Sequence, residues 1–143
     1  MADSLRHARA GFLVPYTVTL NPSGRSVLIR YHHDFDSDTA RQAASEAEAL
    51  RGAAPPGGCG GVVCDARGVR NLSGLGSNYL FVWNTLPAVG ATRLGRVAIV
   101  ADPGDRSHDF VIAVMTGAGY LVELFADPAA ATAWVEAAAK PAV

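Results

Sequence analysis

The chain has 143 residues, of which 50% are hydrophobic and 17% are charged, a composition that excludes a disordered chain. The length is that of one ordinary domain, so we expect a single domain over residues 1–143, with a loose segment at residues 1–10. The formal net charge of −1 supplies no basic surface, which excludes nucleic acid and an anionic membrane as expected partners. Because no apolar run is long enough for a signal-peptide core or a membrane span, we predict a cytoplasmic protein.

The first elements expected along the chain are a hairpin and a helix. Residues 12–20 and 26–32 contain many β-branched and aromatic residues and flank a turn cluster at residues 21–24, which is typical of an antiparallel hairpin. Three residues that favour helix caps follow at positions 36–38, and apolar residues then recur at helical spacing. This pattern predicts a helix from Asp38 to Arg51, which ends before the prolines and glycines that follow.

Strands and helices alternate in the rest of the chain. We predict strands at residues 61–66, 96–101 and 120–125, and helices at residues 75–88, 107–116 and from Asp127 onward, where Asp127 caps the helix and Pro128 opens it. The Val-rich strand at 61–66 should be the centre of the sheet. The order predicts the α/β class, with a mostly parallel sheet of about five strands, an N-terminal antiparallel hairpin and about four helices.

Three segments carry a family resemblance. They are VVCDARGV at 62–69, RVAIVAD at 96–102, and VELFADPAAATAWVEAA at 122–138. Together they resemble the SpoIIAA-like (STAS-like) proteins, whose fold is shared with the STAS domains of anti-sigma-factor antagonists and sulfate transporters and is grouped with CRAL-TRIO lipid carriers. The resemblance implies a SpoIIAA-like topology and a non-enzymatic module for protein contacts, sometimes gated by phosphorylation or occupied by a small ligand.

The resemblance also draws attention to Ser73. In the anti-sigma antagonists the switch serine lies in an aspartate-serine-serine-glycine-leucine-glycine run at the start of the second helix. The similar run here is NLSGLG, residues 71–76, in which Ser73 takes the place of the second serine and Leu72 that of the phosphorylated one. Ser73 is therefore a candidate either for a phosphorylation switch or for a cap of the second helix.

Two loops that leave the carboxyl ends of parallel strands are expected to form a ligand or partner surface, because open α/β sheets usually bind ligands there. We expect an anionic group to be met by Arg106, Ser107 and His108, and a small anionic ligand is accordingly one candidate partner. The residues of the two loops are Asp65, Arg67, Arg70 and Asn71 in the first, and Arg106, Ser107 and His108 in the second.

The second helix also predicts a protein contact. Its main apolar stripe consists of Leu75, Tyr79, Val82, Trp83 and Leu86. Leu80 and Phe81 lie off this stripe and should be exposed in a monomer. We therefore expect the helix to pack on a protein partner or on a second copy of the chain.

Other chemistry-bearing residues favour structural roles. Residues 32–38 contain two histidines and three aspartates, but His32 and His33 point to opposite faces of a strand and the acidic residues coincide with a helix cap, so no metal site is predicted. Cys59 and Cys64 are expected to be free thiols. The run GGCGG lacks the lysine of a phosphate-binding loop and is interpreted as a flexible connector.

Two functions follow from these patterns. The first is a regulatory or protein-interaction module of STAS-like fold, and the alternative is a carrier or sensor of a small lipid-like or anionic molecule. No paired carboxylates, metal signature or nucleophile-base spacing supports turnover, and nothing in the sequence brings His108 to Cys64 and Asp65 as a nucleophilic triad. We therefore expect neither an enzyme nor a cofactor.

Overall fold

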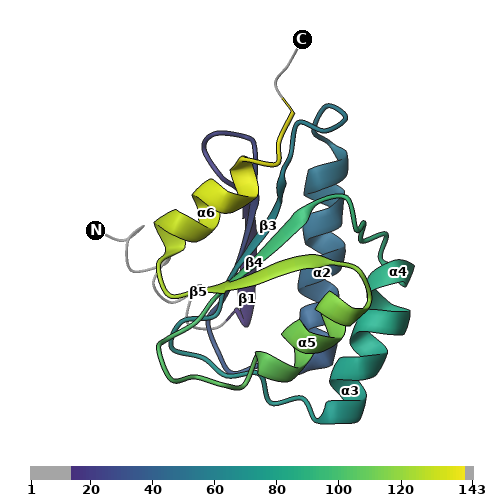
Figure 1. The fold of residues 1–143 in the computed structure, drawn as a ribbon, viewed down its shortest axis with the longest axis vertical. Coiled ribbons are helices and arrows are strands. Elements are labelled where there is room, and N and C mark those ends of the chain that lie inside the picture. Colours follow the sequence, from purple (N-terminus) through teal and green to yellow (C-terminus); the bar gives the residue numbers. More distant parts are fainter. Residues whose placement is uncertain (1–13, 141–143) are drawn as a thin grey trace.

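A five-stranded mixed sheet organises the structure, a computed structural model that describes residues 14–140 (Figure 1). The predicted loose segment at residues 1–10 lies outside the described residues. The strands follow one another across the sheet in chain order, β1-β2-β3-β4-β5. Their bounds are β1 Tyr16–Leu20, β2 Val27–Tyr31, β3 Gly61–Asp65, β4 Arg96–Val100 and β5 Leu121–Phe125. The helical segments are α2 Ser37–Gly52, α3 Leu75–Leu80, η1 Phe81–Thr85, α4 Leu86–Ala88, α5 Asp109–Gly117 and α6 Pro128–Glu136.

The pairing of the strands confirms the predicted α/β class. β1 and β2 form the antiparallel hairpin, and the β2-β3, β3-β4 and β4-β5 pairs are all parallel. The Val-rich β3 is the central strand, as expected from its lack of polar alternation. Parallel neighbours place the ends of β3 and β4 at the same edge, because Asp65 pairs with Val100.

Helices cover both faces of the sheet. Figure 1 shows α6 on one face and α2, α3 and α5 on the other. Side chains alternate accordingly along β3: Val63 packs with Ala131 and Val135 of α6, whereas Val62 packs with the cluster that includes α2. Within residues 14–140, no helix combines the length and the apolarity that crossing a membrane requires.

Three helix starts agree with the sequence, two of them with the predicted caps, and one differs from it. Asp36 caps α2 by accepting a hydrogen bond from the Thr39 N–H, and Asp127 caps α6 by accepting one from the Ala129 N–H. α5 begins at Asp109, two residues later than the predicted start at 107. The difference arises because residues 101–108 form a turn in which the Ser107 N–H donates to Asp105.

The second helix is continuous but not regular. The predicted range 75–88 is divided into α3, the π-helical turn η1 and α4, and the Leu86 N–H donates to the Phe81 carbonyl across the wider turn. Its buried side chains are Asn78, Val82 and Leu86, at a spacing of four residues. Leu75, Tyr79 and Trp83, which the sequence groups with Val82 and Leu86 in one apolar stripe, lie on the adjacent line of the helix and are exposed.

The GGCGG run does not serve as a flexible connector. A Cβ at Gly60 would overlap the Val135 carbonyl oxygen, and a Cβ at Gly61 would overlap the Arg96 carbonyl oxygen. Gly61 also has φ near +147°, a conformation that L side chains rarely adopt. These two glycines let the entry to β3 pack closely against β4 and α6, so their role is backbone packing.

Candidate functional site

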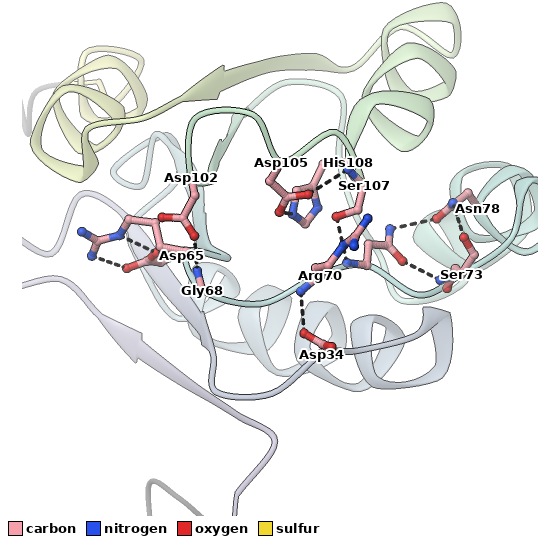
Figure 2. A network of polar contacts seen from close by, with 12 residues as sticks. Asp34, Asp65, Gly68, Arg70, Ser73, Asn78, Asp102, Asp105, Ser107 and His108 are labelled. Atoms are coloured by element: carbon pink, nitrogen blue, oxygen red, sulfur yellow. Dashed lines mark hydrogen bonds and ion pairs between the residues drawn. The ribbon is translucent and has the colours of Figure 1, made fainter.

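The loops that follow β3 and β4 lie against each other (Figure 2). The Gly68 N–H donates to Asp102 Oδ2 at 2.6 Å, and the Asn71 N–H donates to Ser107 Oγ at 3.1 Å. The topology of the sheet explains this proximity, because the carboxyl ends of parallel neighbours share an edge. The two loops on which the sequence placed a ligand surface are therefore joined by direct hydrogen bonds.

The arginines of these loops are largely engaged by carboxylates. Arg67 makes two hydrogen bonds to Asp65, at 3.0 and 2.8 Å, and Arg106 donates to Asp109 at 2.8 Å. Burial opposes ionisation of Asp65, but the Arg67 side chain and N–H outweigh it and lower the pKa of this carboxyl. Two of the three arginines of the expected ligand or partner surface thus have an anionic partner within the protein, and Arg70 is the third.

Ser73 lies at a junction between two helix starts. Gly74, not Ser73, occupies the N-cap of α3, and the Ser73 hydroxyl lies 2.7 Å from the hydroxyl of Ser37 at the start of α2. The expectation that Ser73 caps the helix is therefore wrong, because its side chain reaches across to α2 instead of back to the α3 backbone. Phosphorylation of Ser73 stays a prediction.

A polar cluster of amides fixes the loop around Ser73. Asn71 Oδ1 accepts from the Ser73 N–H at 2.9 Å, and Asn71 Nδ2 donates to Asn78 Oδ1 at 3.1 Å. Asn78 Nδ2 in turn donates to the Ser73 carbonyl at 3.2 Å. Asn78 is buried, so these bonds satisfy an amide that would otherwise be costly to place in the core.

An internal cavity of about 120 Å³ lies between the sheet and the helices of its α2 and α5 face. It is hereafter called the inner cavity. Its floor is formed by side chains of β2, β3 and β4, and its roof by side chains of α2, η1, α4 and α5. The main apolar lining residues are Ile29, Val62, Val97 and Ile99 on the sheet side, and Ala44, Phe81, Leu86, Val111 and Met115 on the helix side. An apolar cavity of this size has room for a small ligand.

Two of the polar residues that line the inner cavity have no hydrogen-bond partner for a buried atom. These atoms are His108 Nε2 and Tyr120 Oη. Asp105 Oδ2 lies 3.4 Å from His108 Nε2, a separation at which the two would form an ion pair if the imidazole were protonated. Burial lowers the pKa of His108 against the opposing effect of Asp105 and Asp109, so the imidazole is neutral at pH 7.

The burial of His108 differs from its expected place at the loop surface. Its side chain is only 2% exposed and stacks on Phe35 with ring centroids 6.0 Å apart. The expectation that His108 joins Arg106 and Ser107 in meeting an external anion is wrong, because the chain turns its imidazole into the core at the start of α5. Ser107 stays at the loop contact with Asn71.

The outer side of the second helix presents apolar side chains. Leu75, Tyr79, Leu80 and Trp83 are between 44 and 66% exposed, and we call these four residues the α3-η1 face. The rings of Tyr79 and Trp83 lie together, with centroids 6.3 Å apart. Leu80 is exposed as expected, whereas Phe81 is half-buried and lines the inner cavity.

The residues considered for metal binding have other partners. Asp34 Oδ1 accepts from the Arg70 N–H at 2.8 Å, and Asp36 is the cap of α2. His32 Nε2 lies 3.2 Å from Thr17 Oγ1. Within residues 14–140, no three histidine, cysteine or acidic side chains are grouped so that they could hold a metal ion.

The cysteines are free thiols in the structure, as expected. Burial, with a smaller effect of the neighbouring Asp65, raises the pKa of Cys64 to about 12. The Cys64 thiol is therefore protonated at neutral pH and is a poor nucleophile. Asp65, which would be the acidic member of a triad with Cys64 and His108, instead accepts a hydrogen bond from Arg67.

Some residues of these sites were not identified from the sequence. Asn78 is a polar residue four positions before Val82 on the helix line that continues to Leu86. A polar residue in such a line is the signal that could have identified Asn78 as a buried, hydrogen-bonded amide. Tyr120 carries no such signal, because an aromatic residue next to a strand is ordinary in a core.

Comparison of the chain with models of protein families, with curated proteins and with solved structures finds no match.

Proposed function

We propose that this chain is a non-enzymatic, STAS-like protein-interaction module that acts through the α3-η1 face. The observation that carries the proposal is the exposure of Leu75, Tyr79, Leu80 and Trp83 on one helix. Soluble monomers rarely leave a large contiguous apolar patch in water, and such patches commonly mark contacts with other proteins. Tyr and Trp are also enriched among the residues that dominate binding energy in protein interfaces.

The occupant that fits this face is a second copy of the chain. No residue from position 71 to position 92 is an Asp, Glu, Lys or Arg, so the α3-η1 face is uncharged. When two identical faces meet around a twofold axis, each side chain meets the same kind of surface, and like charges would repel. An uncharged apolar helix face avoids that cost.

The other exposed apolar residues support a docking surface less well. Leu121 and Leu124 are exposed on β5, but residues an odd number apart in a strand point to opposite faces. Leu94 is exposed in the connection before β4, outside the α3-η1 face. In the α3-η1 face, by contrast, the exposed side chains lie on one helix and include the adjacent rings of Tyr79 and Trp83.

The proposal of a non-enzymatic role rests on the state of the reactive groups. The Cys64 thiol is protonated at neutral pH because burial raises its pKa to about 12, and Asp65 is paired with Arg67. A nucleophile needs an adjacent base or a lowered pKa, and the surroundings of Cys64 act in the opposite direction.

Multi-angle light scattering and sedimentation velocity over a micromolar to millimolar concentration range test the proposal. We expect a reversible dimer, and we expect Leu80→Glu to weaken it by roughly tenfold or more, because the charge would be buried in an apolar contact. The matched control is Leu94→Glu, which introduces the same charge at a side chain that is 92% exposed and lies outside the face. Leu94→Glu should leave the dimer unchanged.

Two results would contradict self-association through this face. One is a monomer at all concentrations, and the other is a dimer that Leu80→Glu and Leu94→Glu weaken equally. In the first case the remaining occupant is a different protein, and a partner captured by the wild-type chain but lost with Leu80→Glu would identify it.

A further inference from the structure

The inner cavity has room for more than water alone. Its volume is about 120 Å³, whereas one liquid water occupies about 30 Å³ and a cavity of about 150 Å³ is sufficient for benzene. The inner cavity is slightly smaller than that benzene site, so we expect a molecule of about six carbons to fit with small shifts of the lining side chains.

The polar residues of the lining divide into satisfied and unsatisfied groups. Ser37 contacts Ser73, Glu48 binds Arg51, and the amides of Asn71 and Asn78 bond to each other. In contrast, the buried His108 Nε2 and Tyr120 Oη have no hydrogen-bond partner among the described residues, although Asp105 Oδ2 lies 3.4 Å from His108 Nε2. Buried polar atoms are rarely left in this state, because each costs about 1 to 3 kcal/mol.

The positions of these two atoms argue against water as the intended occupant. His108 immediately precedes α5 and Tyr120 follows it, so the two side chains start at opposite ends of a nine-residue helix that is about 14 Å long. A buried water usually needs two to four polar partners, whereas the Tyr120 end offers one unsatisfied atom and the space between the two ends is lined by Val111 and Met115.

The charge of the lining excludes an ionised ligand. Among the described residues, Glu48 is the one carboxylate in it and is paired with Arg51, and no Lys or Arg side chain lines the cavity. Burial lowers the pKa of His108, so its imidazole is neutral at pH 7. A carboxylate or phosphate placed there would be desolvated without a counter-charge.

We propose that the inner cavity is a binding site for a small, uncharged and mainly apolar molecule that carries a hydroxyl or carbonyl group. The apolar part lies against Val111 and Met115, and the polar group bonds to His108 Nε2 or to Tyr120 Oη. Within the range of carrier or sensor ligands expected from the sequence, this assignment selects an uncharged molecule and excludes an anion. It is separate from the α3-η1 face, although Phe81 of the same helix contributes to the cavity wall.

Methionine methyl signals offer a direct test. Met115 is the one methionine among residues 14–140, and it lines the cavity. In protein labelled with ¹³C at the methionine methyls, titration with 1-hexanol should shift the Met115 signal saturably. Hexanoate at neutral pH, which has the same chain length and a charge, should bind at least about tenfold more weakly.

Variants connect the signal to the cavity. Ala44→Leu places a larger side chain in the space from α2 and should abolish the hexanol shift, whereas the matched control Ala133→Leu, on the exposed side of α6, should keep it. Tyr120→Phe and His108→Phe each remove one unsatisfied atom while keeping a ring. At least one of them should weaken hexanol binding by about threefold to tenfold without unfolding the protein.

Three results of these titrations would contradict the proposal. A Met115 signal that hexanol does not move up to its solubility limit, or that moves equally in Ala44→Leu, would overturn the site. Equal affinity for hexanoate would overturn the assignment of an uncharged ligand. If neither Tyr120→Phe nor His108→Phe changes the affinity, the proposed hydrogen bond is absent.

Discussion

The side-chain amide of Asn71 donates to Asn78 Oδ1 at 3.1 Å, and Asn78 donates in return to the Ser73 carbonyl at 3.2 Å. This exchange joins the loop after β3 to the buried side of the second helix. The backbone of the same loop is held from another direction, because the Phe35 N–H donates to the Arg70 carbonyl and the Leu72 N–H donates to the Phe35 carbonyl. The start of the second helix, and with it the α3-η1 face, is therefore tied to the loop after β3, and this loop is tied in turn to the segment at Phe35.

Replacing Asn78 should destabilise the protein. Asn78→Ala leaves the Asn71 amide and the Ser73 carbonyl without their partner, and we expect the free energy of unfolding to fall by about 2 kcal/mol. Asn84→Ala, on the exposed side of the same helix, is the control and should change it by less than about 0.5 kcal/mol. Urea unfolding followed by circular dichroism measures both. Equal effects of the two variants would show that the hydrogen bonds of Asn78 contribute nothing to the free energy of unfolding.

Two glycines should respond to alanine in opposite directions. Gly61→Ala forces a Cβ into the Arg96 carbonyl at a φ that alanine disfavours, and we expect a loss of more than about 3 kcal/mol in the free energy of unfolding. Gly76 lies within α3 with open space where the Cβ would be, so Gly76→Ala should stabilise the protein by up to about 1 kcal/mol. Thermal unfolding of both variants tests the pair. A Gly61→Ala variant as stable as wild type would refute the close packing at the entry to β3.

The Cys64 thiol should resist alkylation in the folded protein. Burial raises its pKa to about 12, so at pH 8 only about one thiol in ten thousand is the reactive thiolate. Iodoacetamide treatment followed by peptide mass spectrometry should leave Cys64 unmodified in the native protein and modify it in urea. Modification at the same rate in both conditions would mean that the native thiol is accessible and ionisable.

The elements were predictable from the sequence where one local signal decides. Asp127 with Pro128 and the aspartate at position 36 define two helix starts, and the Val-rich β3 could only be a buried strand. In the second helix, local signals do not predict which side chains are buried. Periodicity groups Leu75, Tyr79 and Trp83 with Val82 and Leu86 in one stripe, although these residues lie on two adjacent lines of the helix. The structure buries the line 78-82-86, where the Asn78 amide has bonding partners, and exposes the line 75-79-83.

The candidate sites divide in the same way. Strand order places the loops after β3 and β4 at one edge, so their contact through Asn71 and Ser107 follows from topology. The inner cavity does not follow from any local pattern, because it results from how side chains of three strands and several helices fill the space between them. His108 illustrates the difference: its position in a loop predicts exposure, and only the packing on Phe35 shows that it is buried.

The burial of His108 should make stability depend on pH. The pKa of His108 in the folded protein is lowered from 6.5, mainly by burial, whereas the unfolded chain keeps a value near 6.5. Between the two values the unfolded state binds more protons, so the free energy of unfolding falls as the pH falls below 6.5 and is unaffected by this group above it. The limiting slope for one histidine is about 1.4 kcal/mol per pH unit.

Urea unfolding at a series of pH values from about 8 to about 5 measures this loss of unfolding free energy. Histidine is the side chain whose ordinary pKa lies in that range. We expect wild type to lose more stability on acidification than His108→Phe, which cannot take up the proton. Burial also lowers the pKa of His32, but His32 is present in both proteins and its contribution cancels in the comparison. Parallel pH profiles for wild type and His108→Phe would mean that the imidazole is protonated equally in the folded and unfolded states. In that case an ion pair with Asp105, 3.4 Å away, would have to compensate for burial, and the cavity would contain a charge.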